Sequence, residues 1–439
     1  MKILLVPFVT DKNRGDQALI WESINLIKGL YDKPEIVLMR GDDESQFTQT
    51  SKLGYSSVRN ILRHPGRNHH TNSHIRYTII DKVLIGIRAI CDLIQTICLL
   101  LPIRIINHLA IWSLPLELKQ TYGVYKECDA VFVKGGGFIH SYGSVVEPYQ
   151  MYFNLFPVLL GIALKKKVYI LPNSIGPLNN RFAAKIADYT LNHCKYVSVR
   201  ESKSLDFLSN RKQIKIPVYR HYDLGYYLKA SDFDAFHYLE EKGIDMEKPK
   251  VVITLRPYRF PGNRNAEEVM QKYITSFTEF VIWLYRDGYQ VVFFAHTIGP
   301  SAHETDSIAI KEVLRNLDEQ HTKSVFIEDE SLNCMDVMAI YSYFDALIGT
   351  RFHSVIFAQN SDVPSLAITY GGYKGDGIMA DLGIGEFAIP MDRVDSHILK
   401  CSFQKLIEEK DSVSDRLKDF HSVSNRDRVE MIQEIKALF

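Results

Sequence analysis

A chain of 439 residues exceeds what one hydrophobic core usually supports, so we expect two domains. Lysine plus arginine and aspartate plus glutamate each number 52, and this balance excludes the broad positive charge typical of nucleic-acid-binding proteins. The six cysteines are scattered and form no Cys-x-x-Cys pair, so the sequence indicates neither a zinc site nor a disulfide framework and fits a reducing compartment.

The chain begins with a short apolar run, residues 2–9, which is followed by a polar turn and then by apolar residues near helical spacing. The run is too short for the core of a signal peptide and no small-residue cleavage site follows it, so we expect a first strand in a cytoplasmic protein. The same cycle of strand, turn and helix recurs along the chain. Further apolar runs that we predict to be strands span residues 35–39, 130–133, 167–171, 196–199, 250–254, 290–294, 324–327, 346–348 and 365–368.

This alternation predicts an α/β fold with two Rossmann-like domains, each built on a parallel sheet. We expect an N-terminal domain over residues 1–225, a C-terminal domain over residues 226–395 and C-terminal helices over residues 396–439. The charged stretch 226–249 suits a linker or a short helix that faces water.

Residues 41–116 depart from this scheme and are predicted to form a helical insertion. From Tyr77 onward a helical stripe of apolar residues continues until Pro102 interrupts it. Its length suits a membrane span, but four charged residues that are costly in hydrocarbon lie within it: Asp81, Lys82, Arg88 and Asp92.

A basic, histidine-rich stretch of the kind that approaches anionic lipid precedes the stripe: Arg59, Arg63, His64, Arg67, His69, His70, His74 and Arg76. Two interpretations of the region follow. Either it makes peripheral contact with the inner face of the plasma membrane, or the stripe is an ordinary amphipathic helix packed on its own domain.

Turns at the carboxyl ends of parallel strands present backbone amides to anions, so ligands collect there. Asn13 and Gly15 lie in the turn after the first strand, although Asn13 or Asp16 serves equally well as a cap for the next helix. A second turn permits the same approach of main-chain N–H groups, or close strand-to-helix packing, through three glycines: Gly135, Gly136 and Gly137.

Polar residues follow three further strands. Asn173 and Ser174 end the strand over 167–171 and can bond sugar hydroxyls, although turn chemistry explains them equally well. Arg200 and Arg256 each lie just past an apolar strand, where a guanidinium suits a carboxylate or phosphate. Pairing of Arg200 with Glu201 is the alternative.

The most informative stretch is Gly349-Thr350-Arg351-Phe352-His353, which joins an apolar strand to a helix. The helix N-terminus, the Arg351 guanidinium and the His353 imidazole are predicted to converge on one anion. Tyr370 and Lys374 lie in a glycine-rich turn after the next strand, which places a second cation nearby.

Taken together and in this order, these segments resemble the polysaccharide pyruvyl transferase family. The resemblance covers nearly the whole chain, and the glycine-flanked Arg351-Phe352-His353 element is its most specific part. It implies a GT-B-like architecture with the active site in a cleft between the two domains. It also implies phosphoenolpyruvate as co-substrate, with no bound metal or cofactor, and a pyruvate ketal formed on a sugar diol of a glycan. That glycan would be lipid-linked or part of an exopolysaccharide, a capsule or a wall polymer.

By this resemblance His353 is the expected general acid and Asp16 a weaker candidate for the general base. The expected donor-binding residues are Arg351, Arg200, Lys374 and Arg256. The family often has aspartate where Glu201 stands and Gly-Gln where Pro172-Asn173 stands, so acceptor recognition is expected to differ. Two other functions remain open: a GT-B glycosyltransferase with a nucleotide-sugar donor, and a non-catalytic glycan-binding scaffold.

Overall fold

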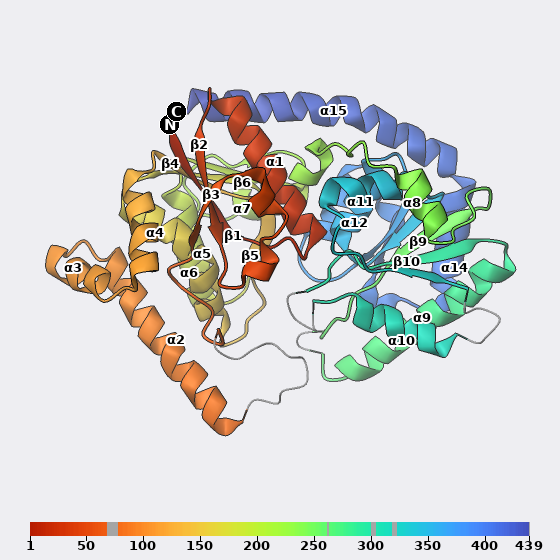
Figure 1. Ribbon diagram of the computed structural model, residues 1–439, viewed down its shortest axis with the longest axis horizontal. Helices are drawn as coiled ribbons and strands as arrows, with labels where there is room; N and C mark the ends of the chain where they lie inside the picture. The colour runs from red at the N-terminus through yellow and green to blue at the C-terminus, as the bar shows by residue number, and fades with distance from the viewer. Residues whose placement is uncertain (68–77, 261–262, 300–303, 318–322, 439) are drawn as a thin grey trace. The chain divides into compact units, whose positions relative to one another are not determined.

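The computed structural model describes residues 1–67, 78–260, 263–299, 304–317 and 323–438 (Figure 1). The chain divides into two compact units. Unit 1 comprises Met1–Asp11, Leu19–Leu224 and Arg428–Phe439, and unit 2 comprises Lys12–Ala18 and Gly225–Asp427. The short segment that follows the first strand therefore belongs to unit 2.

Unit 1 is built on a parallel sheet of eight strands in the order β3-β2-β1-β4-β6-β7-β8, with β5 paired to β6. The strands are β1 (Lys2–Val9), β2 (Glu35–Arg40), β3 (Ser56–Arg59), β4 (Ala130–Val133), β5 (Gly136–Ser141), β6 (Lys167–Leu178), β7 (Tyr196–Val199) and β8 (Tyr219–Arg220). Leu4 and Leu5 point to opposite faces of the central strand and are both fully buried. The sheet is therefore covered on both faces, as parallel sheets usually are.

Among the described residues, the helices wholly within unit 1 are α2 (Ile79–Leu100), α3 (Arg104–Trp112), α4 (Leu116–Glu127), α5 (Glu147–Ala163), α6 (Arg181–Asn192) and α7 (Ser202–Ser209). Two short 3₁₀ turns, η1 (Glu44–Gln46) and η2 (Thr50–Leu53), precede β3. Two helices are divided between the units. Residues 14–18 of α1 (Arg14–Leu30) and residues 410–427 of α15 (Lys410–Ala437) belong to unit 2, and the rest of each helix belongs to unit 1.

Unit 2 carries a second parallel sheet, in the order β11-β10-β9-β12-β13-β14. Its strands are β9 (Lys250–Thr254), β10 (Gln290–Phe294), β11 (Val325–Ile327), β12 (Ala346–Gly349), β13 (Ser365–Thr369) and β14 (Ala388–Pro390). Its helices are α8 (Ala235–Glu241), α9 (Ala266–Arg286), α10 (Ser307–Asn316), α11 (Cys334–Tyr341), α12 (Phe352–Gln359), α13 (Lys374–Asp381) and α14 (Ser396–Glu408), with 3₁₀ turns η3 (Leu224–Tyr227), η4 (Gly385–Phe387) and η5 (Met391–Arg393).

Every strand predicted from an apolar run is present, but two turn predictions in unit 1 are wrong. Residues 172–177 do not end a strand, because β6 continues to Leu178 and its second half pairs with β5, Gly136 opposite Asn173. Register shifts on both sides of this pairing accommodate the prolines of β6. The three-glycine segment accordingly leads into β5 and not into a helix. The expected helical insertion also contains a strand, β3, which extends the sheet.

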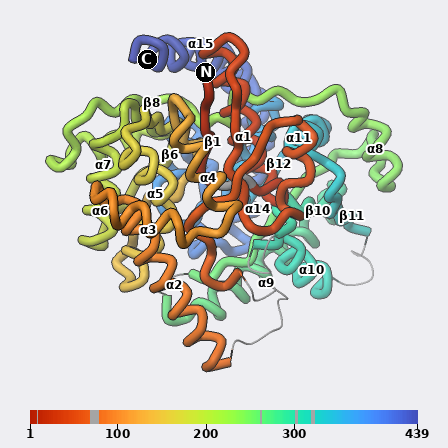
Figure 2. Tube along the Cα trace, turned by 60° about the vertical axis from the view of Figure 1, so that its left-hand side comes forward, coloured from red at the N-terminus to blue at the C-terminus, as the bar shows by residue number. Residues whose placement is uncertain are grey.

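The apolar stripe of α2 does not pack on its own domain, and that interpretation of residues 79–100 is wrong. Ile80, Ile87 and Ile94 are 71%, 53% and 57% exposed. The opposite face of α2 holds the helix to unit 1, where the Tyr152 hydroxyl donates to Thr96 Oγ1 at 3.1 Å. α2 projects from the body of unit 1 in both views (Figures 1 and 2). The prelude residues His69, His70, His74 and Arg76 lie outside the described residues.

Candidate functional site

The predicted Arg351 and His353 pair starts α12 at the carboxyl end of β12, a central strand of unit 2. A Cβ on Gly349 would lie 2.7 Å from Val355 Cγ2, so only glycine allows the strand to turn this closely into the helix. The Nδ1 atom of His353 is 3.3 Å from Nζ of Lys374, which starts α13 after the next strand. Gly371 and Gly372 both have left-handed φ, 53° and 71°, and provide the turn that brings Lys374 there. The structure therefore brings His353 and Lys374 into contact, as the sequence predicted.

The first turn of α1 forms another side of this site. A Cβ built on Gly15 would lie 2.1 Å from His353 Nδ1, closer than real side chains approach. Asn13 caps the helix, since its Oδ1 accepts from the backbone N–H of Gly15 at 3.1 Å and its Nδ2 donates to Asp16 Oδ2 at 3.1 Å. Asn13 and Asp16 thus have the capping role, while Gly15 makes room for the imidazole.

Arg351 is only 8% exposed and forms an ion pair with a carboxylate that the sequence did not single out. Its Nε donates to Asp306 Oδ1 at 2.6 Å and its Nη2 donates to the Glu304 carbonyl. Asp306 also accepts from the backbone N–H of Thr297 at 2.8 Å. Burial raises the pKa of Asp306 to about 6, against the opposing effect of Arg351. Two of the three guanidinium nitrogens of Arg351, Nε and Nη2, therefore donate to this loop.

A buried histidine lies among these cations. His296 is 1% exposed, and its ring packs on Phe357 and Tyr341 at centroid distances of 5.1 and 6.2 Å. Burial, followed by the charges of His353 and Arg14 among others, lowers the pKa of His296 well below its usual range. Within the described part of the chain, its Nε2 has no hydrogen-bond partner. His296 is therefore a neutral imidazole at the carboxyl end of β10.

Arg256 and Tyr370 also meet at this edge of the sheet. The Arg256 guanidinium carbon lies 4.4 Å from the centroid of the Tyr370 ring and 5.4 Å from that of Tyr258, and the two rings are 4.9 Å apart. Cation–π contact holds the guanidinium half-buried without neutralising its charge.

The remaining predicted residues belong to unit 1, where they form a network of their own. Arg200 is 1% exposed; its Nη1 donates to Asp223 Oδ2 at 2.5 Å and its Nε to Ser174 Oγ at 2.8 Å. Ser174 in turn donates to Glu201 Oε2 at 2.8 Å, and burial raises the pKa of this carboxyl. This network consolidates the ends of β6, β7 and β8, so the alternative of ion pairing for Arg200 is the one the structure shows.

Asn173 and the three glycines pack beside that network. Asn173 is fully buried and its Nδ2 donates to the Lys134 carbonyl at 3.0 Å. A Cβ on Gly137 would lie 2.8 Å from Arg200 Nη2, and a Cβ on Gly135 would lie 3.0 Å from the Pro172 carbonyl oxygen. Close packing therefore accounts for glycine at Gly135 and Gly137, while Gly136 is tight only against Phe138.

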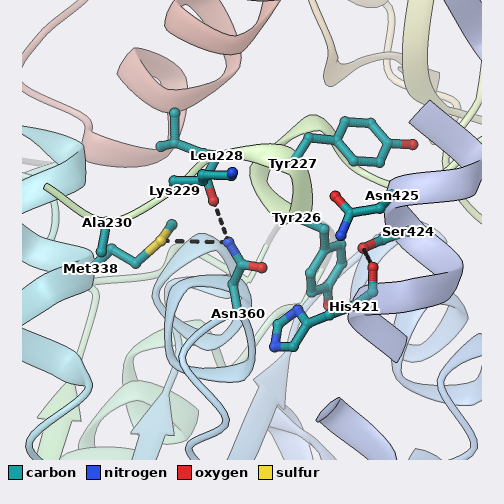
Figure 3. Close-up of a pocket in the computed structure, with 10 residues that line it drawn as sticks. All are labelled: Tyr226, Tyr227, Leu228, Lys229, Ala230, Met338, Asn360, His421, Ser424 and Asn425. Carbon is teal, nitrogen blue, oxygen red and sulfur yellow. Dashed lines mark hydrogen bonds between the residues drawn. The ribbon is translucent and has the colours of Figure 1, made fainter. Parts of the chain in front are cut away.

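A cavity of about 270 Å³ in unit 2 is separate from these residues (Figure 3). Two of its polar groups are bonded to the protein: Asn360 Nδ2 donates to the Leu228 carbonyl at 2.6 Å and the Tyr226 hydroxyl donates to Gln359 Oε1, outside the lining, at 2.6 Å. No residue predicted from the sequence lines it. Among the residues that the structure describes, no group of three or more histidine, cysteine, aspartate or glutamate side chains could hold a metal ion.

Sequence reasoning missed His296, Asp306 and Tyr258. His296 follows β10 in the position that Arg256 and Arg351 occupy after their strands, so the rule applied to those arginines would have found it. Asp306 lies 45 residues before its partner Arg351 in the loop that leads to α10, and no local pattern marks it.

Comparison with known proteins gives a consistent result. A model of the family described as "Polysaccharide pyruvyl transferase" matches residues 13–372. The amylovoran biosynthesis protein AmsJ of Erwinia amylovora is 25% identical over 398 residues, which cover 88% of this chain and 88% of that protein.

Similar solved structures share the fold. The N-terminal domain of Candida albicans trehalose-6-phosphate phosphatase has a TM-score of 0.57 at 13% identity, covering 100% of this chain and 97% of that chain. UDP-GlcNAc 2-epimerase from Neisseria meningitidis, bound to UDP-GlcNAc, has a TM-score of 0.56 at 12% identity, covering 99% and 100%. These similarities carry the fold alone, and they confirm two Rossmann-like units of GT-B-like architecture.

Replacing Gly15 by alanine is expected to displace the His353 ring, because the new Cβ would overlap it. A crystal structure of Gly15→Ala should show the contact of 3.3 Å between Lys374 Nζ and His353 Nδ1 broken. Gly123→Ala on α4 is the control, since nothing lies within 4 Å of its new Cβ. An unmoved imidazole in the Gly15 variant would contradict the packing described.

Removing Arg200 is expected to destabilise unit 1, because Asp223 and Glu201 would remain buried without their cation. We expect Arg200→Ala to cost about 3–5 kcal/mol and to lower the Tm by about 10 °C, measured by thermal denaturation. Adding Asp223→Ala should cost less than the sum of the two single changes. Lys418→Ala is the control, because it removes an ion pair with Asp415 whose side chains are 59% and 73% exposed. It should lower the Tm by about 2 °C or less. A small shift for Arg200→Ala would show that the network is dispensable.

Proposed function

This chain belongs to the polysaccharide pyruvyl transferase family, and from that premise we propose that it transfers the enolpyruvyl carbons of phosphoenolpyruvate to a sugar diol as a cyclic ketal, with release of phosphate. The observation that carries the proposal is the cluster at the carboxyl ends of the unit 2 strands, where His353 contacts Lys374 and Gly15. A polysaccharide substrate follows from the family, and AmsJ is by its name an amylovoran biosynthesis protein.

Phosphoenolpyruvate carries a phosphate and a carboxylate, so its site needs several donors. Lys374 and Nη1 of Arg351 supply two of them, and Arg256, held over the Tyr370 ring, supplies a third. Arg200 is also proposed for donor binding, although it is buried in unit 1 and its Nη1 donates to Asp223.

The proton on His353 is positioned by its neighbour. A lysine ammonium has donors and no acceptor, so Nδ1 of His353 accepts from Lys374 and the ring proton sits on Nε2. In the proposed reaction Nε2 gives this proton to the methylene carbon of phosphoenolpyruvate while Nδ1 takes a proton from the Lys374 ammonium, so the imidazole stays neutral and Lys374 ends as the amine. A sugar hydroxyl then forms a C–O bond at the central carbon, and its own proton passes to a base, for which Asp16, one residue from Gly15, is the candidate.

The second half of the reaction replaces phosphate. The bond between the central carbon and the phosphate oxygen breaks, and the second sugar hydroxyl forms the other C–O bond, with its proton leaving on phosphate. One diol and one phosphoenolpyruvate thus give one ketal and one inorganic phosphate, with no oxidation or reduction. We place the reaction in the cytoplasm and include in the proposal that no resident metal or cofactor takes part, so a chelator should leave the rate unchanged.

We assign recognition of the acceptor sugar to unit 1. Asn173 and Ser174 are occupied within the buried network, so they act on a sugar only through the shape of the β6 segment. Residues 41–116 are the proposed place where the acceptor is selected, and a lipid-linked oligosaccharide is the proposed acceptor class.

Loss of the acid is expected to slow turnover strongly. His353→Ala should lower phosphate release from phosphoenolpyruvate by about 10²- to 10⁴-fold with a panel of lipid-linked or model glycosides, with the product identified by its carboxyethylidene mass increment. Gly15→Ala should also release phosphate more slowly, because its Cβ displaces the His353 ring. The double variant should be no slower than His353→Ala, because both changes act on the same imidazole.

His237→Ala, an exposed histidine of the same unit, is the matched control and should retain full activity. Near-normal turnover of His353→Ala would sink the assignment. Titration calorimetry tests the donor separately: tight binding of a nucleoside diphosphate without binding of phosphoenolpyruvate would favour a glycosyltransferase, and no binding of either would favour a glycan-binding scaffold.

A further inference from the structure

The exposed face of α2 is almost entirely aliphatic. Over the described residues, α2 is the one helix long and apolar enough to cross a membrane. Only 11% of its apolar 18-residue stretch is buried inside the protein. The exposed side chains recur at helical spacing along one face: Ile79, Ile80, Val83, Leu84, Ile87, Ile90, Ile94 and Ile97. An apolar surface of this length is uncommon on a protein that is surrounded by water on all sides.

The same character continues over the turn and along α3. Leu101 and Ile103 in the turn are exposed, and so are Ile105, Leu109 and Trp112, which is 74% exposed at the end of α3. The two helices are held side by side, since Asn107 Nδ2 donates to the Leu99 carbonyl at 2.8 Å and Gln95 Nε2 to Ser113 Oγ at 2.8 Å. Exposed apolar side chains therefore continue from α2 through the turn into α3, and hydrogen bonds join the two helices.

The protein's own contacts prevent this surface from turning inward. Asp92, on the opposite side of α2, accepts from Arg67 Nη1 at 2.5 Å, and Thr96 is fixed by Tyr152. Leu99 is buried in the core of unit 1. Rotation of α2 about its axis would break these contacts and expose Leu99.

Cations flank the apolar face. Lys82 and Arg88 lie on opposite sides of the stripe by helical spacing, and Arg104 starts α3. Within the described residues, none of these three cations forms an ion pair. Two acids of the same region are already paired, Asp92 with Arg67 and Glu117 with Arg59 at 2.7 Å. The rim of the surface is therefore positive, which suits anionic headgroups.

We propose that the apolar face of α2 and α3 lies in the plane of an anionic membrane surface and holds unit 1 there. The charged residues within α2 and its fixed buried side argue against a span, whereas lysine and arginine on the flanks of an apolar face are typical of interfacial helices. Trp112 at the margin has the amphipathic ring that favours the headgroup region.

A second copy of this chain fits the surface less well. Two-fold pairing through the same face would bring Lys82, Arg88 and Arg104 toward their own counterparts, while most of the nearby acids are engaged within each copy. Protein interfaces are also enriched in aromatic residues and methionine, and Trp112 is the one such residue among the exposed side chains of α2 and α3 that the structure describes.

Vesicle flotation tests the proposal with the full-length protein. We expect it to float with vesicles of phosphatidylcholine and phosphatidylglycerol, and the triple variant Ile80→Ser, Ile87→Ser, Ile94→Ser to partition about 10²-fold less or lower. The changed side chains are exposed, so the Tm should stay the same. Trp112 emission should shift to shorter wavelength on binding, and Trp112→Phe should remove that shift.

The charged rim has its own test. Arg88→Gln with Arg104→Gln should weaken binding to the anionic vesicles roughly fivefold per cation and leave binding to pure phosphatidylcholine unchanged. Phe182→Ser with Tyr189→Ser, two exposed side chains of α6, is the control and should float as the unaltered protein does. Equal flotation of the unaltered protein and the triple variant would overturn the proposal, as would a dimer in ultracentrifugation that the triple variant abolishes without any vesicle binding. Flotation does not measure transfer, so its outcome is independent of the proposed reaction.

Discussion

The imidazole of His353 lies where a side chain at position 15 would be, and the candidate site depends on this contact. The first turn of α1 can approach α12 only because Gly15 lacks a Cβ. Backbone bonds hold the turn in unit 2, where Asn13 bridges Thr297 and the Ile298 N–H donates to the Lys12 carbonyl at 2.8 Å. The segment directly after β1 thus becomes a wall of a site in which His353 and Lys374 follow β12 and β13, more than 300 residues later.

The same packing principle operates in unit 1, where Gly137 makes room for the Arg200 guanidinium. In both units an arginine follows an inner strand, β7 or β12, and is joined to a buried aspartate, Arg200 to Asp223 and Arg351 to Asp306. A guanidinium removed from water requires such a partner, because burying an uncompensated charge is costly. The two arginines differ in exposure, since Arg200 is 1% exposed and Arg351 is 8% exposed.

The apolar runs predicted the central strands because residues buried on both faces of a parallel sheet must be apolar. The strand-end rule placed His353 and Lys374 together for a related reason, since parallel strands deliver their following residues to one edge. The ion-pair partners were not predictable, because Asp306 and Asp223 lie in loops whose path no periodicity reveals. The second half of β6 was also missed, since its prolines and Gly176 indicate a turn and only pairing with β5 makes the segment a strand.

Helical periodicity predicted α2 and its end near Pro102, but it could not reveal which face is covered, because α2 is apolar on both sides. Leu99 enters the core while Ile97, two residues earlier, is 42% exposed.

If the acceptor is lipid-linked, docking of the exposed face of α2 on a membrane affects the two substrates differently. Phosphoenolpyruvate is small and reaches the site by diffusion wherever the enzyme is, whereas a lipid-linked sugar is confined to the surface. Holding the enzyme there raises the effective concentration of the acceptor alone, so the exposed aliphatic residues would act on acceptor capture and leave the chemistry at His353 unchanged.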